Sequence, residues 1–196
     1  MAVPPESAYP PPFADAVASL ERARLRPEVV IAQIPAPQGL APYALALSGD
    51  LAQTRFTGDT ELGVGRFVLL HDPERPDAWN GQFRVVCYAQ APLDLDIAAD
   101  SMITDVAWSW ILDALDSRNA AYTAASGTIT TELSTGYGEL ARTGTKARVE
   151  VRASWTPQTS DAAPHVEAWG ELLGMLAGLP PIAEGSVPLQ TRRHHD

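Results

Sequence analysis

Hydrophobic and polar residues alternate at every second position along several parts of the chain, which is typical of strands with one buried face. The clearest case is residues 148–155, RVEVRASW, where Val, Val, Ala and Trp fall on one side and Arg, Glu, Arg and Ser on the other. Shorter patterns of the same kind predict strands at residues 28–34, 43–47, 64–71, 83–88 and 125–133. We therefore expect about six strands.

A second period, with hydrophobic residues recurring every three or four positions, predicts three helices. One begins at the Pro-Pro pair at 11–12, which suits a first helical turn, and another covers residues 162–177. The longest pattern is residues 101–118, SMITDVAWSWILDALDSR. Its apolar arc is wide, so we expect a central helix that is covered on more than one side. Trp108 and Trp110 are interpreted as core residues, with a pocket wall or a partner surface as the alternative.

These elements together predict an α+β fold. The connections between consecutive strands are too short for parallel pairing, so we expect a mostly antiparallel sheet of about six strands. Two or three helices are expected to pack on one face, because the later strands have one apolar and one polar side. We expect a single domain over residues 11–182, a disordered Pro-rich segment at 1–10 and a flexible tail at 183–196.

Composition narrows the classes of function. The chain has 196 residues, of which 45% are hydrophobic, and this suffices for one core. Its formal net charge of −10 disfavours binding to duplex nucleic acid, which is held mainly by Lys and Arg. Cys87 is the only cysteine, so no internal disulfide can form. With no secretory signal at the start and no apolar run of the ~20 residues that a membrane span needs, we expect a soluble cytoplasmic protein.

Four separated stretches together resemble a known family. They are HDPERPDAW at 71–79 with Gly81, WSWILDALDSR at 108–118, SGTIT at 126–130 and RASWTP at 152–157. In this order they are similar to the actinobacterial family known as domain of unknown function 3000, and the likeness covers most of residues 11–190. The resemblance implies membership of that family, but it brings no activity, cofactor or catalytic residue with it.

His71 and Asp72 form the only His–acid pair near the end of a predicted strand, where binding residues are often presented. Together with Arg84 they support an enzyme hypothesis, either a hydrolase or an acid–base catalyst. Acyl transfer also needs a nucleophile, and no G-x-S-x-G or equivalent motif accompanies the pair. The structural alternative is a turn that Asp72 and Pro73 open and that His71 caps.

The sequence predicts no metal site and no cofactor. The four histidines lack the spacing of a zinc site. The glycine turns at 63–65 and 136–138 are followed neither by a helix nor by Gly-Lys-Ser/Thr, so they do not suit a phosphate cradle. Cys87 shares one side of its strand with apolar residues and is interpreted as a buried, inert thiol.

The polar side of the predicted sheet is the remaining candidate site. Alternation assigns to it Arg84, Thr128, Thr130, Glu132, Arg148, Glu150, Arg152 and Ser154. Cross-strand pairs of arginine and carboxylate are an ordinary way to solvate a sheet, and the alternative is a site where several arginines hold an anion or a protein. Trp79 lies in a polar loop with no periodic reason to be buried, so it is a further candidate contact residue.

The preferred hypothesis is a non-catalytic cytoplasmic protein that binds a protein or a small anionic ligand. Its candidate binding residues are His71, Asp72, Trp79, Arg84, Arg148 and Arg152. One alternative is the enzyme built on His71 and Asp72. The other is an RNA-associated regulatory protein, which needs a basic stripe that the net charge does not favour.

Overall fold

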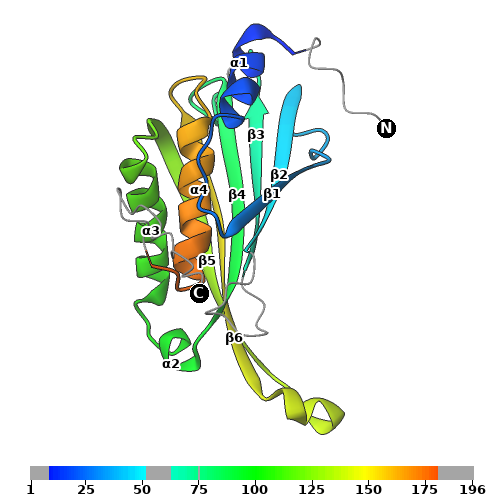
Figure 1. Cartoon of the computed structure of the whole chain (residues 1–196), viewed down its shortest axis with the longest axis vertical. Coiled ribbons are helices and arrows are strands. Elements are labelled where there is room, and N and C mark those ends of the chain that lie inside the picture. The colour runs from blue at the N-terminus through cyan, green and yellow to red at the C-terminus, as the bar shows by residue number, and fades with distance from the viewer. Residues whose placement is uncertain (1–8, 52–62, 75, 181–196) are drawn as a thin grey trace, which may run out of the picture.

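One antiparallel sheet organises the part of the chain that the structure describes, residues 9–51, 63–74 and 76–180 (Figure 1). In these residues the computed structural model has the strands β1 (Val29–Ile34), β2 (Tyr43–Leu51), β3 (Val64–His71), β4 (Phe83–Leu93), β5 (Tyr122–Thr135) and β6 (Thr145–Pro157). They lie in the order β1-β2-β3-β4-β6-β5, and every neighbouring pair is antiparallel. The predicted α+β class and the predicted number of strands are therefore confirmed.

The helices pack on one face of this sheet (Figure 1). They are α1 (Pro11–Leu20), α3 (Ile103–Ser117) and α4 (Ala163–Leu176), whereas the short α2 (Leu95–Ala98) has no buried residue, and a 3-10 helix, η2 (Gly138–Thr143), joins β5 to β6. The expectation that the helix at 101–118 would be central was wrong, because α4 runs down the middle of the face and α3 lies beside it. Glycine and alanine let α4 lie close to its neighbours, and most of its residues are buried.

The contact between α4 and the sheet centres on Trp169, which is 1% exposed. Gly49 and Gly65 are register partners on β2 and β3, and the indole ring fills the space that their missing side chains leave. A Cβ atom at Gly65 would lie 2.9 Å from the Trp169 ring and 2.8 Å from Leu173. The indole Nε1 also donates a hydrogen bond to the carbonyl of Tyr88 (3.2 Å). Trp169 thus fixes both the distance and the position of α4 on the sheet.

A buried ion cluster joins α4 to the segments on either side of it. Arg26, which precedes β1 and is 3% exposed, pairs with Glu28 (3.3 Å) and with Glu171 of α4 (3.5 Å). Arg118, which follows α3, pairs with the same Glu171 and with Glu167 (3.4 Å). Removing one partner of a buried pair leaves the other charge uncompensated. The cluster therefore specifies how α3, α4 and the chain before β1 fit together.

Two other buried side chains are neutral at physiological pH. Cys87 in β4 is 2% exposed, and burial raises the pKa of its thiol to about 12, so it is not a nucleophile near neutral pH. This is the buried thiol that the sequence predicted. His165, at the start of α4, accepts a hydrogen bond at Nδ1 from Nε1 of Trp155 (3.0 Å), and burial lowers its pKa to about 4.

Parts of two expectations concern residues outside those described. The disordered segment at 1–10 is described only from residue 9 onward, and the flexible tail at 183–196 is not described at all. Within the described ranges, no helix is both long and apolar enough to cross a membrane.

The substitution Gly65→Ala is expected to lower the free energy of unfolding by about 1–3 kcal/mol, because the added methyl group overpacks the space beneath Trp169. Chemical denaturation followed by tryptophan fluorescence measures this change. The double variant Gly65→Ala/Trp169→Leu tests the cause, since the alanine must cost less once the indole is gone. An equal cost in both backgrounds would show that the indole is not the obstacle.

His165 is expected to make the stability depend on pH. Its pKa is about 6.5 in an unfolded chain and about 4 in the fold, so the unfolded chain binds more protons. The free energy of unfolding therefore falls as the pH drops below about 6.5, by about 3 kcal/mol at a pH of about 4. Urea denaturation of wild type and His165→Gln across this range isolates the effect from that of the carboxylates. A difference between the two proteins that does not change with pH would contradict it.

Candidate functional site

The face of the sheet opposite the helices carries side chains from all six strands, and we call it the open face. Alternation and register assign to it Val30, Ala32, Ile34, Ala44, Ala46, Ser48, Asp50, Val64, Arg66, Val68, Leu70, Arg84, Val86, Tyr88, Gln90, Pro92, Ser126, Thr128, Thr130, Glu132, Ser134, Lys146, Arg148, Glu150, Arg152, Ser154 and Thr156. All eight polar residues that the sequence placed on this side are among them.

The middle of the open face is a row of register partners across four strands. Arg66 of β3 lies beside Tyr88 of β4, which lies beside Arg152 of β6, and Thr128 of β5 follows. The Arg152 guanidinium lies over the Tyr88 ring at 5.8 Å, and its Nε donates a hydrogen bond to Glu150 Oε1 (2.7 Å). This row therefore combines an aromatic ring with two exposed arginines on rigid strands.

Glu150 links the middle row to the next one. Its other oxygen, Oε2, lies 3.1 Å from the hydroxyl of Tyr88, and Gln90 Oε1 is a second acceptor for the same hydroxyl at 3.0 Å. Burial and then the hydrogen bond to Glu150 raise the pKa of Tyr88, so the phenol remains a donor. One row further, Arg148 lies 3.8 Å from Glu132, an exposed pair of small energetic value.

Arg84 is held by bonds within the fold. Its Nη1 donates to the carbonyl of Ala124 (3.0 Å) and to Oγ1 of Thr156 (3.1 Å), and its Nη2 donates to Oγ of Ser126 (3.2 Å) and of Ser154 (2.5 Å). Ala124 has a φ of 51°, and the β5–β6 register shifts between Thr123 and Ser126. Arg84 therefore holds a β-bulge in the edge strand, and burial lowers the pKa of its guanidinium.

The loop between β3 and β4 places Trp79 next to this bulge. The hydroxyl of Thr156 donates to the carbonyl of Trp79 and also accepts the bond from Arg84. Trp79 is half-buried, and it is not part of the hydrophobic core. At the start of the same loop, Asp72 accepts a hydrogen bond at Oδ1 from the backbone N–H of Glu74 (3.0 Å). The predicted turn is therefore present, but Asp72 rather than His71 caps it.

His71 lies on the helix-covered face, beneath α1. It is 1% exposed, and its ring centroid lies 5.8 Å from that of Phe13, 5.9 Å from Tyr43 and 4.6 Å from Phe83. Neither ring nitrogen has a hydrogen-bond partner among the described residues. Burial lowers the pKa of His71, against a smaller opposing effect of Asp72. An imidazole closed off by aromatic rings does not have the geometry of a general base.

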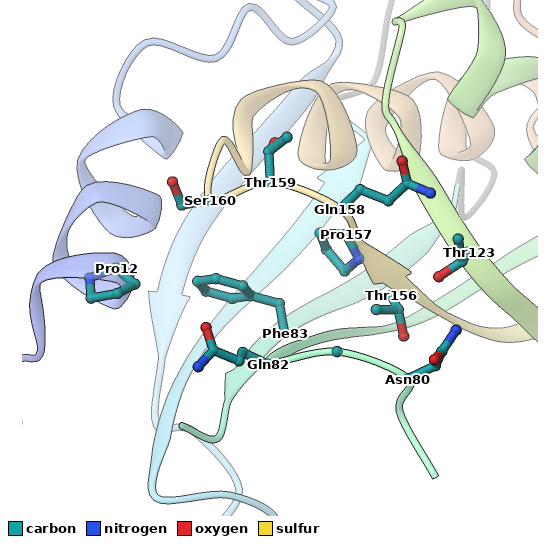
Figure 2. Close-up of a pocket in the computed structure, with 11 residues that line it drawn as sticks. Pro12, Asn80, Gln82, Phe83, Thr123, Thr156, Pro157, Gln158, Thr159 and Ser160 are labelled. Carbon is teal, nitrogen blue, oxygen red and sulfur yellow. The ribbon is translucent and has the colours of Figure 1, made fainter. Parts of the chain in front are cut away.

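A polar cavity of about 440 Å³ lies beyond Phe83, between the start of α1, the end of the β3–β4 loop and the segment that follows β6 (Figure 2). Amides and hydroxyls line it, including those of Asn80, Gln82, Thr156 and Gln158, and none of its lining residues is ionisable. Phe83 lines the cavity and also contacts His71. The cavity thus provides no ionisable acid or base.

The structure brings three of the six candidate residues, Arg84, Arg148 and Arg152, to the open face. Asp72 and Trp79 lie in the β3–β4 loop, at one end of the open face. His71 is on the helix-covered face of the sheet. In the described ranges no group of three or more His, Cys, Asp or Glu side chains could hold a metal ion.

Sequence reasoning missed Arg66 and Tyr88 as candidate contact residues. Alternation in 64–71 and 83–88 already indicates that both lie on the polar side. Their meeting in one row with Arg152 depends on the register of β3, β4 and β6, which no local pattern reports.

His71→Leu is expected to leave the stability unchanged or to raise it by about 1 kcal/mol, because it removes two unpartnered polar atoms from an apolar site. Thermal and urea denaturation at neutral pH measure the effect. The control Phe13→Leu opens space over the same ring cluster and should destabilise the protein. A clear loss of stability in His71→Leu would contradict this prediction and would mean that the imidazole makes a stabilising hydrogen bond.

Comparison with known proteins identifies a family but no characterised relative. No curated protein and no solved structure matches the chain. The family described as "Protein of unknown function (DUF3000)" matches residues 9–187, which include all four of the stretches that suggested it. The chain therefore belongs to the DUF3000 family.

Proposed function

We propose that the protein is a non-catalytic binding module whose open face holds an acidic segment of another protein. The observation that carries this proposal is the charge of that face. It bears five basic side chains and three acidic ones, whereas the whole chain has a formal net charge of −10. A locally basic surface on an acidic protein favours an anionic partner.

The middle row supplies the contacts that such a partner needs. Arg66 and Arg152 flank Tyr88, and arginine guanidinium groups bind carboxylates through two parallel hydrogen bonds. The Arg152 side chain is 67% exposed although Glu150 accepts a bond from it, so its remaining donors face solvent. Tyrosine and arginine are also the residue types enriched in the parts of interfaces that contribute most to affinity.

Apolar side chains next to this row favour a protein rather than a small anion. Val64 and Val86 are 45% and 38% exposed, and half-buried Val68 is the register partner of Val86 on the neighbouring strand. A small inorganic anion gains nothing from these groups, whereas a peptide can bury them while its carboxylates reach the arginines. The strands hold all of these groups in place, so little conformational entropy is lost on binding.

The absence of a catalytic arrangement around His71 supports a binding role rather than an enzymatic one. The imidazole is enclosed by Phe13, Tyr43 and Phe83, and the neighbouring cavity has no ionisable lining residue. The proposal keeps the cytoplasmic location expected from the sequence.

A fluorescein-labelled deca-glutamate peptide is expected to bind the protein at low salt and to perturb the amide NMR signals of Arg66, Tyr88 and Arg152. Arg152→Glu should weaken this binding tenfold or more, because a lost charge contact of about 1.4 kcal/mol corresponds to a factor of ten. The matched control is Arg22→Glu, which makes the same charge change at an exposed position at the end of α1. Equal loss in both variants, or perturbation elsewhere on the protein, contradicts the open-face site.

Trp79→Ala is expected to change the free energy of unfolding by no more than about 1 kcal/mol, as for an ordinary surface change, while weakening capture of the natural partner from lysate. The half-buried ring is outside the core, and its loop ends at the open face. Denaturation and pull-down measure the two effects. A cost of about 3 kcal/mol or more would assign the ring to the core instead. Arg84 is unsuitable for such a test, because its substitution releases the β5 bulge.

A further inference from the structure

Exposed apolar side chains gather at one end of the molecule. In the described residues, twelve large hydrophobic side chains are exposed, and seven of them lie on α2, the start of α3 or the outer part of the β5–β6 hairpin. These seven are Leu95, Ile97, Met102, Val106, Leu133, Tyr137 and Leu140. Exposed apolar patches on a protein surface typically mark sites of association.

One part of this surface is a projecting arm. β4 pairs with β6 only as far as Leu93 and Ala147, whereas β5 and β6 continue to pair as far as Thr135 and Thr145. The hairpin therefore extends beyond the body of the sheet, with η2 at its tip (Figure 1). On this tip Tyr137 is 81% exposed.

Hydrogen bonds fix the conformation of the tip, residues 136–144, and its apolar side chains face solvent. The backbone N–H of Gly136 donates to the carbonyl of Gly144 (3.2 Å), and Oγ1 of Thr143 donates to the carbonyl of Leu140 (2.7 Å). Gly136 has no room for a side chain, because a Cβ atom there would lie against the backbone of Leu140. Leu140 nevertheless remains 65% exposed. Nothing within the described chain covers Tyr137 or Leu140.

The second part is a patch on α2 and the residues that follow it. Leu95 and Ile97 are each 45% exposed, and Met102 is 54% exposed. Asp100 holds the end of this segment, because its Oδ1 accepts a hydrogen bond from the backbone N–H of Met102 (2.8 Å). We call Leu95, Ile97 and Met102 the α2 patch.

The tip and the α2 patch have opposite charges. The acids Asp94, Asp96, Asp100 and Asp105 are exposed and lie next to the patch residues in the sequence, and residues 94–105 include no basic residue. The tip and its base carry Arg142 and Lys146 against the single acid Glu139. The two surfaces therefore match in both respects, apolar to apolar and basic to acidic.

Within one chain the tip points away from α2, so it does not cover its own patch (Figure 1). The two features lie on opposite sides of the same end of the molecule. In a two-fold dimer the contact of one tip with the α2 patch of the other copy is repeated in reverse, so a single type of contact closes the assembly. We propose that the chain forms a symmetric dimer in which the hairpin tip of each copy docks on the α2 patch of the other. None of the residues of the tip or of the α2 patch belongs to the middle row of the open face, so the proposal does not rest on the proposed binding function.

Sedimentation velocity and light scattering on the full chain test the proposal. The wild type is expected to have twice the 21.0 kDa mass of one chain at micromolar concentration. The tip variant Tyr137→Glu/Leu140→Glu and the patch variant Ile97→Glu/Met102→Glu should each be monomeric, with unchanged far-UV circular dichroism. Leu40→Glu is the matched control, because Leu40 is 55% exposed in the loop between β1 and β2. It should remain dimeric.

Mixing the two variants distinguishes tip-to-patch docking from other dimers. The mixed pair regains one unaltered tip on one unaltered patch, so an equimolar mixture is expected to form a heterodimer at higher concentration than wild type requires. A dimer made by tip against tip or patch against patch regains no complete contact on mixing. A mixture that stays monomeric at every concentration where wild type is dimeric therefore overturns the proposal.

A charge exchange provides a second line of evidence that does not alter the apolar groups. Arg142→Asp should weaken the dimer at least tenfold, and adding Asp96→Arg in the same chain should restore part of the loss. A wild type that is monomeric throughout, or that forms assemblies larger than a dimer, contradicts the closed two-fold arrangement. Dimerisation that Arg142→Asp leaves unchanged contradicts the charge match.

Discussion

The seating of Trp169 against Gly49 and Gly65 is the contact on which the rest of the structure depends. Gly49 and Gly65 are register partners, and because they lack side chains they leave a flat place on the helix-covered face of the sheet. A ring of this size is buried completely there, and its polar edge finds an acceptor in the carbonyl of Tyr88. α4 consequently lies against the middle of the sheet, and α3 takes its place beside it, held through Glu171 by the ion cluster.

The packing of the helices on one face determines which side chains of the sheet remain exposed. Because the helices pack on one face, the other face takes the acidic and basic side chains of the six strands, including four of the arginines. The strands also differ in length. β5 and β6 extend further than β4, so Tyr137 and Leu140 lie beyond the part of the sheet that the helices cover. The molecule therefore has a basic open face and, at one end, the apolar residues of the tip and the α2 patch. The middle row of the open face shares no residue with the tip or the patch.

Two of the candidate residues show why residue type alone is a poor guide to a site. His71 is chemically the most versatile side chain near a strand end, yet its position under α1 leaves it between three aromatic rings. Arg84 is a cation on the polar face, but its two terminal nitrogens are occupied by β5 and β6 at the bulge. Arg152, by contrast, has most of its side chain in solvent. What separates these residues is their neighbours on other strands, which are distant in the chain.

The sequence by itself determined the fold class, nearly all of the strands and helices, and the face on which each later strand residue lies. These follow from local periods of two and about 3.6 residues, which apolar burial imposes on any strand or helix with one covered side. Only the tertiary structure decided that β6 lies between β4 and β5, that α4 rather than α3 is central, and that Arg66, Tyr88 and Arg152 form one row. Such facts depend on pairing between segments far apart in the chain, and the free energy of that pairing comes from contacts that no single stretch contains.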